Sequence, residues 1–269
     1  MALSLRERRG ITLVELLVAL VISALIVGAA YRAFIRQQKT YATQEQVVDL
    51  QQNARISINK MMDEIMMAGF GNVTSYLTSG GVSGFTKVIT PTSASEVTIV
   101  GGGVTPVLAN DGAPVKVTAM SGTAVTLNLA TNNILANQLI CIGAETFRVA
   151  SKDNLNLTLD KAPSFDVTGK TVFQVNAVTY RVGTSGAKSY LERNGENIAD
   201  NIEDIQFEYL DVNGDKITSP VDPDKIRMVK VTLTAKAEIS DPDYKGGDGG
   251  FRKRTIASNI KVRNLGLNP

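Results

Sequence analysis

Residues 10–31 of this 269-residue chain read GITLVELLVALVISALIVGAAY. The 21 residues from Ile11 to Tyr31 would form a helix about 32 Å long, enough to cross the hydrocarbon core of a bilayer. Glu15 is the only charged side chain in this segment. Because a carboxylate inside a bilayer costs roughly 2.5–3.5 kcal/mol on insertion scales, its presence predicts that it has a partner. A plain single-span anchor has no need of such a residue.

The polar stretch ahead of this segment, residues 1–10, contains three arginines and one glutamate. Positive charge before an apolar segment favours a cytoplasmic N-terminus and export of the chain that follows. An ordinary secretory signal shares these features, and residues 28–30, Gly-Ala-Ala, could serve as its small-residue cleavage site. The carboxylate of Glu15 and a helical pattern that continues past residue 30 argue against that interpretation. The sequence predicts an anchored N-terminus.

Residues 10–18, GITLVELLV, resemble the N-terminus of type IV prepilins and type II secretion pseudopilins. The family pattern is a glycine, a hydrophobic residue, Thr-Leu-(Ile/Val)-Glu and a long apolar helix. The resemblance implies that residues 1–10 are a leader peptide, cleaved by a prepilin peptidase between Gly10 and Ile11, and that Ile11 is then N-methylated. It also implies that Glu15 faces the terminal amine of a neighbouring subunit. Such a pair would set subunit register, since either charge alone is strongly penalised in a low-dielectric core.

The helical pattern continues well beyond the apolar segment. No proline occurs before Pro91, and one set of apolar residues recurs at intervals of three or four: Val47, Leu50, Ala54, Ile58, Met61, Ile65 and Ala68. This spacing places them on one face of a helix. Such a stripe can form a coiled-coil seam, but it is short for one and more often docks on the sheet of its own domain. Glycines at positions 69 and 71 are expected to end the helix. The sequence predicts a helix over 11–71, with 11–31 in the membrane.

The remainder of the chain has a β-like pattern. Residues 72–95 are rich in Gly, Ser and Thr and are expected to form a linker loop. Residues 96–168 contain short β-like runs, beginning at Val97–Val100, which predict a small barrel or meander inserted into the domain. Residues 169–269 are expected to form the C-terminal β-domain. The predicted fold class is α+β, with a long N-terminal transmembrane and amphipathic helix followed by an antiparallel pilin-type domain with a β-rich insertion.

Three local expectations concern the C-terminal domain. Apolar and polar residues alternate from Val229 to Ile239, which predicts a half-buried antiparallel strand. Residues 172–182 predict one strand with a bulge near Ala177. A helical turn through Ile198 and Ile202 is expected before the next strand.

Several short stretches in this portion resemble PilW-like minor pilins and the related J-type minor pseudopilin of type II secretion. They are residues 178–181 (VTYR), 191–195 (LERNG), 199–203 (ADNIE), 207–209 (FEY) and 262–265 (VRNL). The resemblance implies a minor pilin that helps initiate pilus assembly at or near the tip. Its partners would be the prepilin peptidase, other major and minor pilins, the inner membrane and the pilus assembly platform. It would be a single-pass inner-membrane protein before assembly and then part of a periplasmic or cell-surface filament.

Other functions stay open at this point. A minor pseudopilin differs from a minor pilin in its partners rather than in its physics. A tip adhesin or DNA-uptake subunit would use residues 96–168 as a binding surface. A secreted enzyme held by its signal is the alternative of a different class. The chain contains no histidine, which removes the Ser-His-Asp triad and most zinc sites, so we expect no enzymatic activity and no cofactor.

The sequence offers two further candidate ligand sites. Asp211, Asn213 and Asp215 place oxygen atoms at alternate positions, as in a calcium loop, but the loop has its glycine at the fourth position rather than the sixth and no Glu at the twelfth. A hairpin turn explains them better. The basic run 252–254 could contact nucleic-acid phosphates. The formal net charge of +2 equals that of the leader, however, which does not favour a nucleic-acid partner. Cys141, the single cysteine, is expected to be a core residue.

Overall fold

The computed structural model describes residues 11–186, 188–241, 244–246 and 249–265. The predicted leader, residues 1–10, therefore lies outside the described residues. The chain forms two compact units, Met1–Asp49 and Leu50–Pro269. The long helix α1 (Leu13–Met66) contributes to both, and each unit is described by itself.

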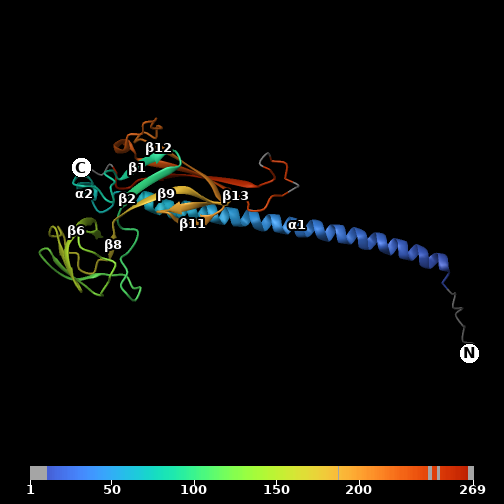
Figure 1. Cartoon of the computed structure of the whole chain (residues 1–269), viewed down its shortest axis with the longest axis horizontal. Helices are drawn as coiled ribbons and strands as arrows, with labels where there is room; N and C mark the ends of the chain where they lie inside the picture. The colour runs from blue at the N-terminus through green and yellow to red at the C-terminus, as the bar shows by residue number, and fades with distance from the viewer. Residues whose placement is uncertain (1–10, 187, 242–243, 247–248, 266–269) are drawn as a thin grey trace, which may run out of the picture. The chain divides into compact units, whose positions relative to one another are not determined.

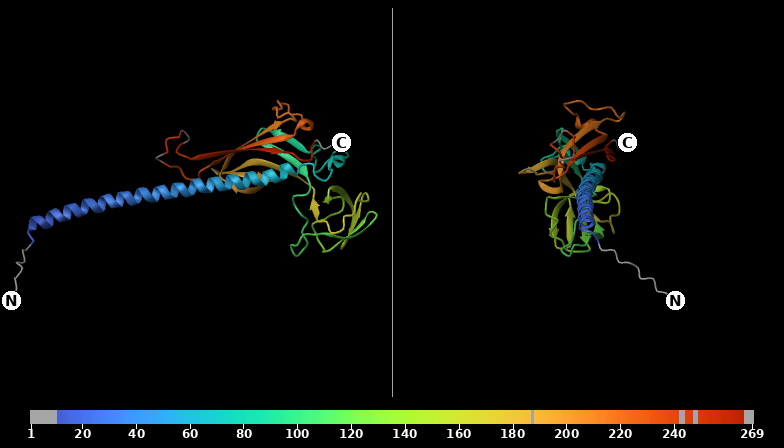
Figure 2. Two further views of the ribbon diagram at one scale, coloured as in Figure 1. Left: turned by 180° about the vertical axis from the view of Figure 1, so that it is seen from behind. Right: turned by 90° about the vertical axis from the view of Figure 1, so that its right-hand side faces the viewer.

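The second unit contains two antiparallel sheets that share one core (Figures 1 and 2). The five-stranded sheet has the order β1 (Ile89–Ser93), β2 (Glu96–Gly101), β9 (Asn176–Ser185), β10 (Lys188–Arg193) and β11 (Glu196–Asp200). The three-stranded sheet has the order β12 (Ile202–Leu210), β13 (Met228–Lys236) and β14 (Lys253–Lys261). A short 3-10 helix, η1 (Pro223–Lys225), precedes β13. A long apolar N-terminal helix followed by antiparallel sheets confirms the α+β fold class.

Apolar periodicity explains which faces are buried. The predicted stripe on α1 is buried at Leu50, Ala54, Ile58, Met61 and Ile65, and it packs in the same core as the sheets. The alternation predicted for 229–239 is confirmed in β13, where every second side chain from Val229 to Ala235 is buried. It was wrong at the C-terminal end, because β13 ends at Lys236 and Ile239 is 65% exposed. Each large apolar side chain buried in this way stabilises the fold by about 1.5–3 kcal/mol.

A third sheet, with six strands and a core of its own, lies between β2 and β9 in the sequence. Its order is β3 (Val117–Ser121), β4 (Ala124–Leu127), β7 (Asn156–Leu159), β6 (Glu145–Asp153), β5 (Leu139–Ile142) and β8 (Val172–Gln174). Its buried residues include Val115, Val125, Ile140, Phe147 and Leu157. Figure 1 shows these strands, coloured green to yellow, as a group of their own.

Two expectations about strand membership were wrong. The run Val97–Val100 was expected in the insertion, but it forms β2 and pairs with β9 in the five-stranded sheet. Residues 97–100 are all buried, so the run has no polar face from which its sheet could be inferred. The strand predicted over 172–182 is divided near Val175 rather than bulged at Ala177. Its first part, β8, pairs with β5, whereas the second part, β9, pairs with β2 and β10.

Two expectations about local structure also need correction. The region 72–95 is not one loop, because it contains the short helix α2 (Thr74–Thr78) and strand β1. Strand β1 lies at the edge of its sheet, where a proline such as Pro91 is tolerated. No helical turn runs through Ile198 and Ile202, since β11 and β12 occupy these positions and find partners in β10 and β13. Sequence-distant partners override weak local preference.

The helix α1 ends at Met66, five residues before the predicted boundary. Turns follow, and the glycines at 69 and 71 adopt φ of +76° and +84°. The N–H of Gly69 donates to the carbonyl oxygen of Val100 at 2.9 Å, so the chain leaves the helix by bonding to β2. A side chain on Gly71 would meet the Cys141 sulfur at 2.7 Å.

Candidate functional site

The start of α1 is organised by two residues of the predicted processing motif. The Thr12 N–H and hydroxyl donate to one Glu15 carboxylate oxygen at 3.0 and 3.1 Å. In return, the Glu15 N–H donates to the Thr12 hydroxyl at 3.2 Å. This reciprocal arrangement is a capping box, which satisfies N–H groups that the first turn leaves without partners. It holds the Glu15 carboxylate beside Thr12, at the start of the helix.

The first part of α1 presents an apolar surface all the way round. Ile11 and Leu13 are 79% and 78% exposed, and large apolar residues stay exposed as far as Phe34. The helix is long and apolar enough to cross a membrane, and none of its most apolar stretch is buried. An exposed apolar surface of this extent marks contact with lipid or with other proteins.

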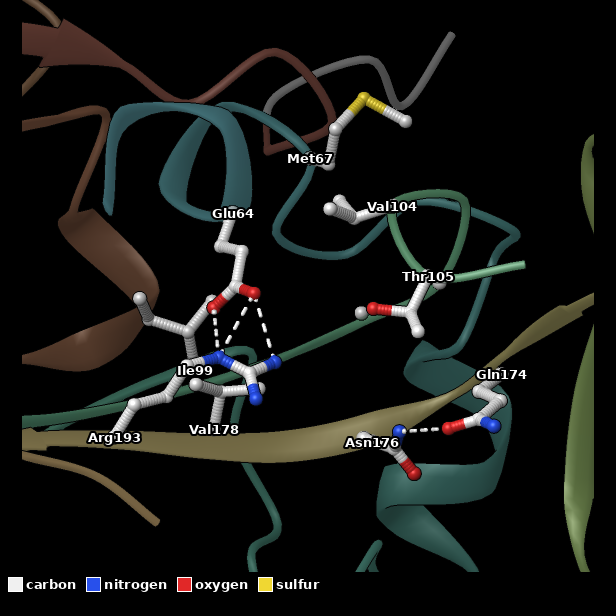
Figure 3. Close-up of a pocket in the computed structure, with 11 residues that line it drawn as sticks. Glu64, Met67, Ile99, Val104, Thr105, Gln174, Asn176, Val178 and Arg193 are labelled. Carbon is white, nitrogen blue, oxygen red and sulfur yellow. Dashed lines mark hydrogen bonds and ion pairs between the residues drawn. The ribbon is translucent and has the colours of Figure 1, made fainter. Parts of the chain in front are cut away.

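A buried carboxylate in the second unit forms the other polar cluster of note (Figure 3). Glu64 projects from α1 and is only 5% exposed. The Tyr180 hydroxyl of β9 donates to one of its oxygens at 2.8 Å. The Arg193 guanidinium of β10 donates to both oxygens, at distances from 2.8 to 3.3 Å. Burial raises the pKa of Tyr180, and the neighbouring Glu64 charge adds to that rise.

The bonds of this cluster join α1 to the five-stranded sheet, since Tyr180 lies on β9 and Arg193 on β10. The adjacent cavity has a volume of about 30 Å³. The sequence analysis did not single out Glu64. The available signal for its burial was its position three residues after Met61, which places it on the face of the helix that carries the apolar stripe.

The candidate calcium residues form a hairpin turn. One Asp211 oxygen accepts bonds from the N–H groups of Asn213 and Asp215 at 2.8 and 3.0 Å, and Gly214 has a φ of +87°. This carboxylate therefore closes its own turn. Over the described parts of the chain, no group of three or more His, Cys, Asp or Glu residues is placed to hold a metal ion. The structure thus shows Asp211 as a turn residue, and calcium binding by this loop stays a prediction.

The basic run at 252–254 is divided among different partners. Arg252 pairs with Asp241 at 2.8 Å and Lys253 pairs with Glu203 at 2.7 Å, whereas Arg254 is exposed. The run is therefore not a uniform cationic patch. Cys141 is fully buried, and burial raises the pKa of its thiol to about 12.

Comparison with known proteins bears on the N-terminus. Residues 5–31 match the family described as the prokaryotic N-terminal methylation motif. No match was found among curated proteins or among solved structures. Gly10, Ile11 and Glu15 all lie within the matched residues, and their individual roles stay predictions. The apolar helix and the motif together fit anchoring in the inner membrane before assembly. The chain carries a type IV prepilin-like signal, which supports the type IV pilin and pseudopilin family.

Proposed function

We propose that this chain is a PilW-like minor type IV pilin that is incorporated into a pilus and helps to initiate its assembly at or near the tip. The observation that carries the proposal is the exposed apolar start of α1, which begins with a capped carboxylate inside a methylation motif. The proposal assigns the chain no catalytic activity and no cofactor. Its partners are the prepilin peptidase, other pilins and the assembly platform.

The proposed mechanism begins with cleavage between Gly10 and Ile11, which creates a new amine, and methylation of that amine follows. The apolar helix can leave the bilayer because the filament core offers equally apolar surroundings, so its transfer avoids exposure to water. Glu15 then pairs with the terminal amine of a neighbouring subunit. The capping box supports this step, since it holds the carboxylate in a defined position before the partner arrives.

The domain after the helix supports the finer assignment. Stretches 178–181 and 191–195 carry part of the resemblance to PilW-like proteins, and their Tyr180 and Arg193 both bond to Glu64 of α1. In the proposal these residues keep the sheet attached to the helix, so that a subunit built into a filament stays folded.

The first test is mass spectrometry of the mature N-terminus, in membranes and in sheared surface filaments. We expect a methylated tryptic peptide that begins at Ile11 and ends at Arg32. An intact leader would mean a plain membrane anchor, and a start after Ala30 would mean a secreted protein. Either result would overturn the proposal.

A second test separates processing from assembly. Glu15→Ala should leave cleavage and methylation intact but remove the chain from sheared filaments. Glu45→Ala is the matched control, because Glu45 is an exposed carboxylate farther along the same helix. Normal incorporation of the Glu15 variant would contradict the assigned pairing.

The methylation motif is shared with pseudopilins, so a minor pseudopilin of a type II secretion system is the second candidate. Crosslinking in cells followed by identification of the partner chains distinguishes the two. Loss of pili on deletion supports the first, and loss of protein secretion with normal pili supports the second. A tip adhesin or DNA-uptake role would instead be indicated if deleting the six-stranded sheet abolished binding while pili persisted.

A further inference from the structure

The outer edge of β14 carries backbone groups that lie beyond the hydrogen-bond ladder. Every residue from Lys253 to Lys261 is paired with β13, and the register has no bulge. In such a ladder, alternate residues direct their backbone groups to the neighbouring strand and the others direct theirs away. The Ala237 N–H donates to the Arg252 carbonyl oxygen at 2.8 Å, and the Val262 N–H donates to the Arg227 carbonyl oxygen at 3.0 Å. The backbone N–H and C=O groups of the even-numbered residues of β14 therefore point towards β13.

The residues whose backbone N–H and C=O groups point away from β13 are therefore the odd-numbered ones: Thr255, Ala257, Asn259 and Lys261. All four are exposed, and their outward N–H and C=O groups have no hydrogen-bond partner within the described parts of the chain. The edge ends at Arg263, whose N–H donates to the carbonyl oxygen of Met66 at 3.2 Å. Seven residues, 255–261, thus form an open edge about 24 Å long.

This edge lacks most of the devices that normally protect a free strand. Proteins block edges with prolines, bulges, short strands or charges along the strand. The strand β14 has nine residues without a proline or a bulge, and its centre, Thr255–Asn259, is uncharged. Its cations are at the ends: Arg254, Lys261 and Arg263 are exposed and form no ion pair with another described residue.

This charge pattern selects among possible occupants. If β14 of a second copy paired with this edge, cations would lie against cations at the ends, and like charges directly across two strands are destabilising. An added strand with acidic ends would instead meet opposite charges at both ends. The charge pattern therefore disfavours pairing with a second copy and favours a different partner. Repulsion of an unwanted partner is one way in which a binding site gains specificity.

We propose that the outer edge of β14 is a docking site for an extended segment of a partner polypeptide, which has an uncharged, β-prone centre and Asp or Glu at both ends and adds as a fourth strand to the three-stranded sheet. Main-chain hydrogen bonds supply attraction in this mode of recognition, and side chains supply selectivity. This inference goes beyond the proposed function, since it depends on the folded domain and not on processing of the N-terminus.

The test uses the full chain in detergent micelles and two labelled peptides, Asp-Thr-Val-Thr-Val-Thr-Val-Glu and Lys-Thr-Val-Thr-Val-Thr-Val-Lys, with binding followed by fluorescence anisotropy. The end residues of each peptide are seven positions apart, as Arg254 and Lys261 are, so both ends can face these cations. We expect the acidic peptide to bind at least tenfold more tightly, a ratio equivalent to about 1.4 kcal/mol. Ala257→Pro should abolish binding, because it removes an outward N–H at an edge position where proline is tolerated. Ala257→Val keeps the N–H and is the matched control.

Charge reversal tests the second element of the proposal. The double variant Arg254→Glu, Lys261→Glu should reverse the preference in favour of the basic peptide. Circular dichroism melts establish that each variant is folded. Absence of saturable binding, or equal binding by the Ala257→Pro and Ala257→Val variants, would overturn the proposal. So would sedimentation showing that the chain self-associates and that Ala257→Pro prevents it, because a second copy would then be the occupant.

Discussion

Replacing Glu64 by Gln should destabilise the second unit by about 3 kcal/mol. Breaking a buried ion pair by removing one partner costs about 3–5 kcal/mol, since it leaves an uncompensated charge. Glu64 is 5% exposed but the Arg193 side chain is 22% exposed, so partial access of water to Arg193 places the cost at the lower end. Tyr180→Phe removes one bond to a charged acceptor, which costs about 1.5–3 kcal/mol.

The measurement is thermal unfolding of the full chain in detergent micelles, followed by circular dichroism in the β region. For a unit of this size, 1 kcal/mol corresponds to about 2–4 °C in Tm, so Glu64→Gln should lower Tm by about 6–12 °C. The two substitutions together should cost less than the sum of their separate effects, because they disrupt one network. The matched control is Lys60→Gln. Lys60 lies 3.7 Å from the same carboxylate but is 46% exposed, so its loss should cost less than about 1 kcal/mol.

A shift for Glu64→Gln no larger than that for Lys60→Gln would refute this reasoning. It would mean that the bonds from Tyr180 and Arg193 to the Glu64 carboxylate contribute little to the stability of the fold. Strict additivity of Glu64→Gln and Tyr180→Phe would also refute it, because the two residues would then act independently.

Three further predictions concern other parts of the second unit. Two lysine partners lower the pKa of Glu208 from 4.5 to about 2, so this carboxylate stabilises the fold fully above pH 4.5 and progressively less as the pH falls towards 2. The Tm difference between wild type and Glu208→Gln should follow that window, and a difference independent of pH would contradict it. Because burial raises the pKa of the Cys141 thiol to about 12, iodoacetamide at pH 8 should label it only in denaturant, and rapid labelling of the native chain would disprove its burial. In urea unfolding, Gly71→Ala should destabilise the fold more than Gly112→Ala. Both glycines have a φ of +84°, which costs about 1–3 kcal/mol for alanine, but only a side chain at position 71 would meet another side chain. Equal effects of the two substitutions would rule out the clash.

Local patterns were sufficient for the elements that bury one continuous face. The stripe from Leu50 to Ile65 and the alternation from Val229 to Ala235 follow the 3.6 and 2 residue periods of helix and strand, and both faces are buried as expected. The N-terminal motif was equally readable, because a lone carboxylate in an apolar segment is costly enough to be informative.

Partnerships between distant residues could not be read in this way. Strand β2 is buried on both faces, so its sequence does not show that it pairs with β9 rather than with the six-stranded sheet. A glutamate on a helix is usually solvated, so the residue type alone does not indicate that Glu64 is buried. Its burial is possible only because Tyr180 and Arg193, more than a hundred positions away in sequence, bond to its carboxylate.

The sequence by itself therefore determined the apolar helix with its lone carboxylate and the α+β class, because these depend on periodicity and on the cost of transferring single groups into an apolar environment. The tertiary structure decided which strands share a sheet, where Glu64 finds its donors and which edge of β14 is left open. Those features depend on backbone and side-chain partners that are brought together only when the chain folds.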